Sequence, residues 1–152
     1  MNIAIIDTGI TEEATYSNCK VKHFSMSGKE LVNKYQKPVD DHGTECFKEL
    51  MESAGNVELQ ILDLNILEDK GNLEVESIIR AIEKAIEERV DLINISLGVM
   101  DYSKEMYDVC DKAVCNNIVV VSAASHTNTI SFPADFNNVI CVKVDQSQTG
   151  KN

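Results

Sequence analysis

Residues 2–10 read NIAIIDTGI, a short apolar run that ends on an aspartate, a threonine and a glycine. An uninterrupted apolar run of this length predicts a buried strand, residues 2–6, in a parallel sheet. Open parallel sheets bind ligands beyond the carboxyl ends of their strands, so Asp7 is a candidate for chemistry. Gly9 would allow a tight turn directly after it.

The rest of the chain alternates predicted strands with predicted helices. Further strands are expected at residues 21–25, 57–64, 91–97, 117–123 and 139–144, and helices at residues 42–54, 73–89 and 103–114. The clearest helix carries an apolar stripe made of Ile78, Ile79, Ile82, Ala85 and Ile86. This alternation predicts a single α/β domain over residues 1–152, in which helices flank a mostly parallel sheet as three layers.

Composition excludes several classes of function. The net charge is −11 and no basic stripe is present, so we expect no nucleic-acid partner. The apolar run at residues 3–6 is too short for a signal-peptide core or a membrane span, so we expect no membrane association. The five cysteines form no C-x-x-C pair, and their odd number favours reduced thiols in a cytoplasmic protein. We interpret them mainly as small buried hydrophobic residues.

His42 opens the predicted helix at residues 42–54, between Asp41 and Gly43. A buried acid after a strand and a histidine at a helix start are two of the three members of a charge-stabilised catalytic triad. Taken singly, each residue has a simpler explanation. Asp7 could cap a turn, and His42 could be a helix-terminal histidine beside Asp41.

Other polar residues also follow predicted strands. Ser96 ends one strand together with Leu97 and Gly98, and Ser125 and His126 follow the next. The carboxyl ends of parallel strands lie at one edge of the sheet, so we expect these positions to converge there with Asp7 and His42.

The order of these motifs resembles that of a subtilisin-like serine protease, or subtilase. The resemblance covers residues 2 to about 145 and rests on Asp7-Thr8-Gly9-Ile10, His42-Gly43-Thr44, residues 92–98, residues 119–124, and Ser131-Phe132-Pro133-Ala134 followed by Val139-Ile140. It implies that Asp7 is the catalytic acid and His42 the catalytic base of peptide-bond hydrolysis.

The resemblance also implies a substrate site. Ser96, Leu97 and Gly98 match the strand that pairs with a substrate backbone, so the expected ligand is an extended peptide or protein segment. Ala123, Ala124 and Ser125 match the floor of the specificity pocket.

Three positions depart from the family pattern. His126 stands where the family has an oxyanion-hole asparagine, and Glu45 replaces the second histidine that usually follows His-Gly-Thr. Residues 1–152 contain no Gly-Thr-Ser nucleophile motif at the start of a late helix, and Ser147 lies in a polar tail. We therefore expect this chain alone to show no proteolysis.

Three functions follow from these observations. The chain could be a serine-endopeptidase homologue completed by further polypeptide, a pseudoprotease that binds extended peptides, or an assembly module. An uncovered part of the sheet would favour a homo-oligomer or a complementing partner chain.

Two other uses of the same residues remain open. Asp7, Asp41 and His42 could bind a divalent metal, although no second ligand cluster has metal spacing, and we expect neither a metal site nor a cofactor. Cys46 could be a nucleophile beside a base, although packing on the inner face of its helix is the simpler role.

Overall fold

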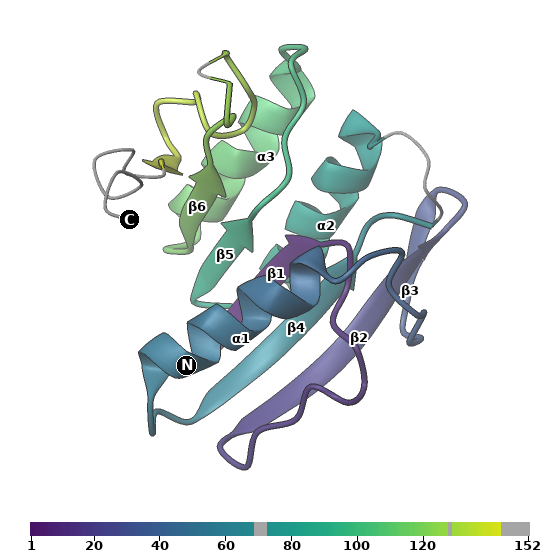
Figure 1. Ribbon diagram of the computed structural model, residues 1–152. Coiled ribbons are helices and arrows are strands. Elements are labelled where there is room, and N and C mark those ends of the chain that lie inside the picture. The colour runs from purple at the N-terminus through teal and green to yellow at the C-terminus, as the bar shows by residue number, and fades with distance from the viewer. Residues whose placement is uncertain (69–72, 128, 144–152) are drawn as a thin grey trace, which may run out of the picture.

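The computed structural model describes residues 1–68, 73–127 and 129–143, which form a seven-stranded sheet and three helices (Figure 1). The strands are β1 (Asn2–Asp7), β2 (Cys19–Ser27), β3 (Glu30–Val32), β4 (Leu59–Asn65), β5 (Leu92–Ile95), β6 (Val119–Ala123) and β7 (Ile140–Val142). The helices are α1 (His42–Ala54), α2 (Val75–Glu87) and α3 (Lys104–Cys115). The strand order is β3-β2-β4-β1-β5-β6-β7, and only β3 runs antiparallel to its neighbour.

β1 occupies the centre of the sheet and carries Asp7 at its carboxyl end. It pairs in parallel with β4 on one side and β5 on the other. Every residue of β1 after Asn2 is buried, which agrees with the uninterrupted apolar run in the sequence. The same edge therefore receives the carboxyl ends of β4, β1, β5 and β6.

Helices cover the two faces of the sheet unequally. α1 packs Phe47 and Met51 onto one face, in a core that includes Ile3 and Ile5 of β1. α2 and α3 pack together on the opposite face, where Ala4 and Ile6 of β1 join a larger core. Side chains alternate between the faces along each strand, so β1 supplies both cores.

In the part of the chain that the structure describes, no helix covers the α1 face of the sheet over β6 and β7 (Figure 1). Val120 belongs to the α2–α3 core, so its neighbour Val119 lies on the α1 face, where it is 44% exposed. The β6–β7 register places Ile140 and Val142 on this face as well, with exposed fractions of 56% and 51%. Figure 1 shows α1 lying over β1 and β4, away from these strands. We call Val119, Ile140 and Val142 the open apolar face.

The predicted fold is confirmed, and several details are wrong. β2 extends over Cys19–Ser27 and is longer than the expected strand at residues 21–25, and β3 was not expected. β5 stops at Ile95, because the chain leaves the β1–β5 ladder there and Val99 bridges to Phe132. Differences of one or two residues at the other ends are ordinary fraying of element boundaries.

The interpretation of the cysteines as buried holds for Cys110 but is wrong for Cys115 and Cys141, which are exposed. Cys115 lies at the end of α3, and Cys141 lies on β7, one of the two edge strands of the sheet. Among the described residues, no helix is both long and apolar enough to cross a membrane.

Candidate active site

Asp7 and His42 form a direct hydrogen-bonded pair at the carboxyl edge of the sheet. Oδ1 of Asp7 lies 2.7 Å from Nδ1 of His42 and also accepts a hydrogen bond from the backbone N–H of Thr8 at 2.7 Å. Asp7 is fully buried, whereas the side chain of His42 is 47% exposed. In the tautomer that donates from Nδ1 to this carboxylate oxygen, Nε2 is left to accept a hydrogen bond.

The loop after β1 and the first turn of α1 are joined by hydrogen bonds between their polar side chains and backbones. The N–H of Gly43 donates to Oγ1 of Thr8 at 3.0 Å, and the N–H of Thr11 donates to Oγ1 of Thr44 at 3.1 Å. These bonds satisfy one of the N–H groups that a helix start leaves free and tie His42 to the strand that carries Asp7.

Asp40 provides a further anchor that the sequence did not suggest. Its Oδ1 accepts a hydrogen bond from the backbone N–H of His42 at 3.0 Å. The hydroxyl of Thr8 and this N–H together hold the pKa of the Asp40 carboxyl below its usual value. Asp40 is therefore ionised at neutral pH at the positive end of α1.

A second aspartate–histidine pair, which was not predicted from the sequence, lies on the neighbouring strands β4 and β2. Asp63 on β4 is 2% exposed, and its Oδ2 accepts hydrogen bonds from Nδ1 of His23 at 2.7 Å and from the N–H of Ile10 at 3.2 Å. Burial raises the pKa of Asp63, and the hydrogen bond from His23 opposes this rise. The sequence signal is a charged residue inside the mostly buried strand LQILDLN.

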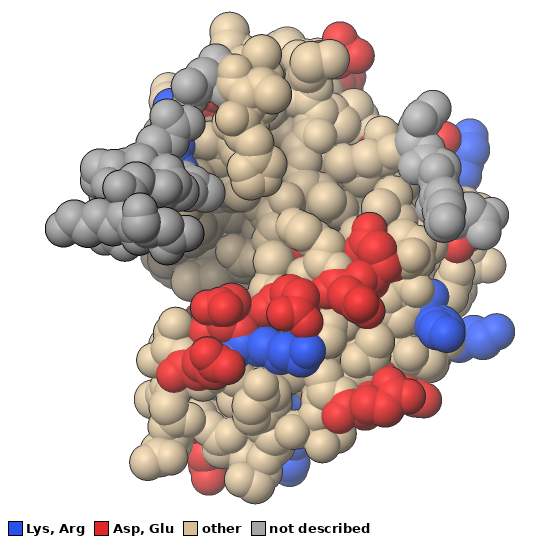
Figure 2. Space-filling model, viewed as in Figure 1, with Lys and Arg blue, Asp and Glu red and all other residues tan. Residues whose placement is uncertain are grey.

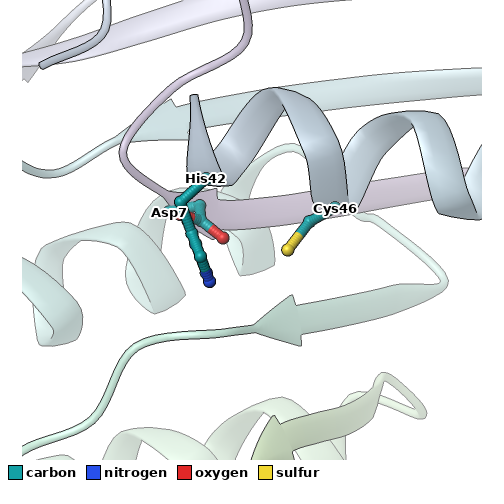
Figure 3. A group of neighbouring side chains, drawn as sticks. All are labelled: Asp7, His42 and Cys46. Atoms are coloured by element: carbon teal, nitrogen blue, oxygen red, sulfur yellow. The ribbon is translucent and has the colours of Figure 1, made fainter. Parts of the chain in front are cut away.

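Cys46 completes a small cluster with Asp7 and His42. One potential ligand atom from each of the three residues lies within 4.8 Å of the other two. Figure 3 shows the three side chains converging on one space, with a carboxylate oxygen of Asp7 directed toward the sulfur of Cys46. Burial raises the pKa of the Cys46 thiol, so the neutral thiol prevails and is a weak nucleophile.

The predicted substrate segment lies beyond β5. The Ser96 hydroxyl accepts a hydrogen bond from the side chain of Asn94 at 3.0 Å, and Leu97 packs half-buried against the larger core. A β-carbon on Gly98 would lie 3.1 Å from the carbonyl oxygen of Phe132, so this segment runs close beside the chain around residue 132. Ser96, Leu97 and Gly98 therefore lie beyond the strand. The expected strand at residues 91–97 is corrected to Leu92–Ile95.

The residues after β6 lie at the same edge but do not contact His42 through any hydrogen bond that the structure describes. The N–H of Ala124, the residue after Ala123, donates to the carbonyl of Val142 at 2.8 Å. Ser125 bonds the hydroxyls of two nearby threonines, each at 2.9 Å. His126 is exposed, and its ring takes part in none of the hydrogen bonds among the described residues. Ser147 lies outside the described residues.

The residues that could hold a metal differ from the expected set. The structure groups Cys46 with Asp7 and His42, whereas Asp41 is exposed and does not belong to the group. Glu45, which received no role, pairs with Lys48 on the surface of α1 at 2.7 Å.

Sequence comparison agrees with this geometry. The model of the Subtilase family matches residues 1–149. The chain is 31% identical to Subtilisin DY from Bacillus licheniformis, over 93% of this chain and 55% of that protein. It is 30% identical to Subtilisin E from Bacillus subtilis, over 93% of this chain and 40% of that protein. The chain thus spans about half, or less, of the length of these relatives.

Solved structures show the same fold. The S41 psychrophilic protease superposes with a TM-score of 0.75 at 20% identity, over 92% of this chain and 52% of that structure. The psychrophilic subtilisin-like protease Apa1 from an Antarctic Pseudoalteromonas superposes with a TM-score of 0.64 at 18% identity, over 92% of this chain and 35% of that structure.

Proposed function

Because this chain belongs to the subtilase family, we propose that Asp7 and His42 are the acid and base of a serine-type site for peptide-bond hydrolysis. The observation that carries the proposal is the 2.7 Å contact between Oδ1 of the fully buried Asp7 and Nδ1 of His42. In this mechanism Nε2 of His42 takes the proton of a serine nucleophile and later gives it to the leaving amine. Asp7 fixes the tautomer and stabilises the imidazolium.

The nucleophile would come from polypeptide beyond these 152 residues, either a longer form of the chain or a partner. Two observations support this part of the proposal. The chain spans 55% of Subtilisin DY, and the open apolar face gives a further segment a surface to cover. Burying Val119, Ile140 and Val142 would stabilise such a complex at roughly 25 cal/mol per Å² of apolar surface removed from water.

The substrate would be an extended peptide along Ser96, Leu97 and Gly98, held by main-chain hydrogen bonds. Ala123, Ala124 and Ser125 would line the floor of the pocket for one of its side chains. His126 would supply the oxyanion donor through a ring N–H. Such a donor contributes roughly 10²–10³ in turnover, and a histidine provides it with a different length and shape from an amide.

The test is labelling by a fluorophosphonate together with hydrolysis of a chromogenic peptide. We expect neither from residues 1–152 alone, above a His42→Ala control. Sequencing the native reading frame past codon 152 would identify any following segment with a Gly-Thr-Ser motif. The chain with that segment, fused or added, should label and hydrolyse, and His42→Ala should remove the hydrolysis. Binding of the added segment without labelling would overturn the hydrolase proposal.

The second candidate function is peptide binding without cleavage, and His126 at the oxyanion position favours it. The two functions differ in chemistry but share the peptide segment. Leu97→Pro should then weaken binding of an extended peptide, measured by fluorescence anisotropy. Unchanged peptide affinity in this variant would rule out the proposed peptide segment and leave an assembly role for the open apolar face.

A further inference from the structure

We propose that Asp7, His42 and Cys46 form a binding site for a divalent cation of the zinc type, and that the bound cation competes with proton transfer at His42. The second half of this inference rests on the proposed function, whereas the first half stands on the geometry of the three side chains.

The fold brings the three ligand atoms together from two elements. Asp7 ends β1, while His42 and Cys46 lie four residues apart on α1 and therefore share one side of the helix. The three ligand atoms lie within 4.8 Å of one another. In a tetrahedral zinc site with bonds of about 2.0–2.3 Å, ligand atoms are about 3.3–3.8 Å apart. Small rotations of the exposed imidazole and of the thiol would close this difference.

An independent observation points to a missing partner in the same place. Asp7 is 0% exposed, and its Oδ2 has no hydrogen-bond partner among the described residues. A buried carboxylate oxygen without a partner is costly, and the usual solutions are a hydrogen-bond donor or a metal. Figure 3 shows a carboxylate oxygen of Asp7 directed into the space that the sulfur of Cys46 also faces.

The donor set selects the class of metal. Thiolate sulfur and imidazole nitrogen favour zinc and cobalt over magnesium and calcium, which prefer oxygen ligands alone. Cys46 would bind as the thiolate and release its proton to solvent, and His42 would bind through an unprotonated ring nitrogen. Three protein ligands leave a fourth position for water.

The surroundings favour the approach of a cation. The His42 side chain is 47% exposed, which gives access from solvent. Figure 2 shows acidic side chains gathered over α1, whose exposed side carries Glu45, Glu49 and Glu52. A cluster of negative charge raises the local concentration of cations.

Occupation of this site would block acid–base chemistry. The cation would use the carboxylate that orients the imidazole, and its charge would oppose formation of the imidazolium. Metal-bound and proton-transferring forms therefore exclude each other. Zinc would act as a reversible inhibitor of the completed protease.

The experiment is a titration of the 152-residue chain with Co²⁺, followed by the thiolate-to-cobalt charge-transfer band and the visible bands of tetrahedral cobalt. We expect one equivalent to bind and Zn²⁺ to displace it. Cys46→Ser should remove the charge-transfer band and weaken cobalt binding at least about tenfold. His42→Ala should weaken cobalt binding to a similar extent. The matched control is Cys115→Ser, because Cys115 is an exposed thiol that lies 3.9 Å from the carboxylate of Asp111 on α3.

A charge-transfer band that survives in Cys46→Ser, or that disappears in Cys115→Ser, would overturn the site. Absence of any cobalt or zinc binding to the folded chain would overturn it as well, and circular dichroism establishes that each variant is folded. The spectroscopic result does not depend on hydrolysis. Failure of the protease proposal and failure of the metal site are therefore distinguishable.

Discussion

Gly43 lies against the backbone of Gly9 so closely that a β-carbon at position 43 would be 2.6 Å from the Gly9 carbonyl oxygen. The start of α1 thus rests directly on the loop that follows β1. This contact, together with the hydrogen bond from Gly43 to Thr8, positions His42 over Asp7.

Gly43→Ala should push the start of α1 away from the loop after β1. The new methyl group would meet the carbonyl oxygen of Gly9, which is a backbone atom and cannot rotate away. We expect a loss of roughly 1–3 kcal/mol in the free energy of unfolding, as for other overpacked sites. Urea denaturation measures the loss. Glu45→Ala, on the exposed side of the same helical turn, is the control and should change stability by no more than about 0.5 kcal/mol. Equal stability of Gly43→Ala and the wild type would show that the loop yields at this point.

Asp63 should make stability depend on pH. Burial raises its pKa in the folded chain above the ordinary value of 3.8, so folding favours the neutral carboxyl. The stability that the neutral Asp63 contributes is fully present below its pKa in the unfolded chain. It is lost as pH rises through its pKa in the folded chain. Wild type should therefore gain stability relative to Asp63→Asn as the pH falls from 7 toward 4, measured by urea denaturation at each pH.

The neighbouring charges provide the control for this experiment. His23 lowers the pKa of Asp63, and Asp7 raises it. His23→Gln, introduced into both the wild type and Asp63→Asn, removes the titrating partner of Asp63. The gain in stability on acidification, relative to the chain that carries Asp63→Asn, should then become larger. If wild type instead loses stability relative to Asp63→Asn on acidification, the ion pair with His23 outweighs the burial of Asp63.

The cysteines should differ in reactivity because of where the fold places them. Burial raises the pKa of Cys110 to about 12, whereas Cys115 and Cys141 are exposed. At pH 8 iodoacetamide should therefore modify Cys115 and Cys141 within minutes and leave Cys110 unmodified, as mass spectrometry of peptides would show. In urea, Cys110 should react at a rate comparable to those of Cys115 and Cys141. Modification of Cys110 in the native chain would mean that α3 opens locally.

The sequence predicts local features well where one physical signal dominates. The span of α1 was predicted at His42–Ala54, because its apolar spacing and Gly55 mark the helix and its end. Gly55 adopts a positive φ of 60° there and donates its N–H to the carbonyl of Met51. The Asp7–His42 pair was predicted from motif order, since parallel strands place their loops at one edge.

What the sequence could not predict depends on contacts between distant residues. β3 has only three residues, and its pairing with β2 gives no periodic signal. The four-residue spacing of His42 and Cys46 is visible in the sequence, but the approach of Cys46 to Asp7 depends on how α1 packs on β1. Asp63 gave a usable signal, a charge inside a buried strand, whose partner His23 becomes visible only when β2 and β4 are paired.

The open apolar face should make the isolated chain associate. Val119, Ile140 and Val142 are each more than two fifths exposed. Val119 lies on β6, and the other two lie on β7, one of the two edge strands of the described sheet. Edge strands with exposed apolar residues pair readily with further chains. At micromolar concentration, light scattering should therefore detect dimers or larger species, and Ile140→Lys should weaken their association at least about tenfold by burying a charge in the contact.

Val57→Lys is the matched control, because Val57 is 49% exposed but precedes β4, far from β7 in the strand order. A monomeric wild type under these conditions, or equal weakening by both substitutions, would contradict a role of this face in association.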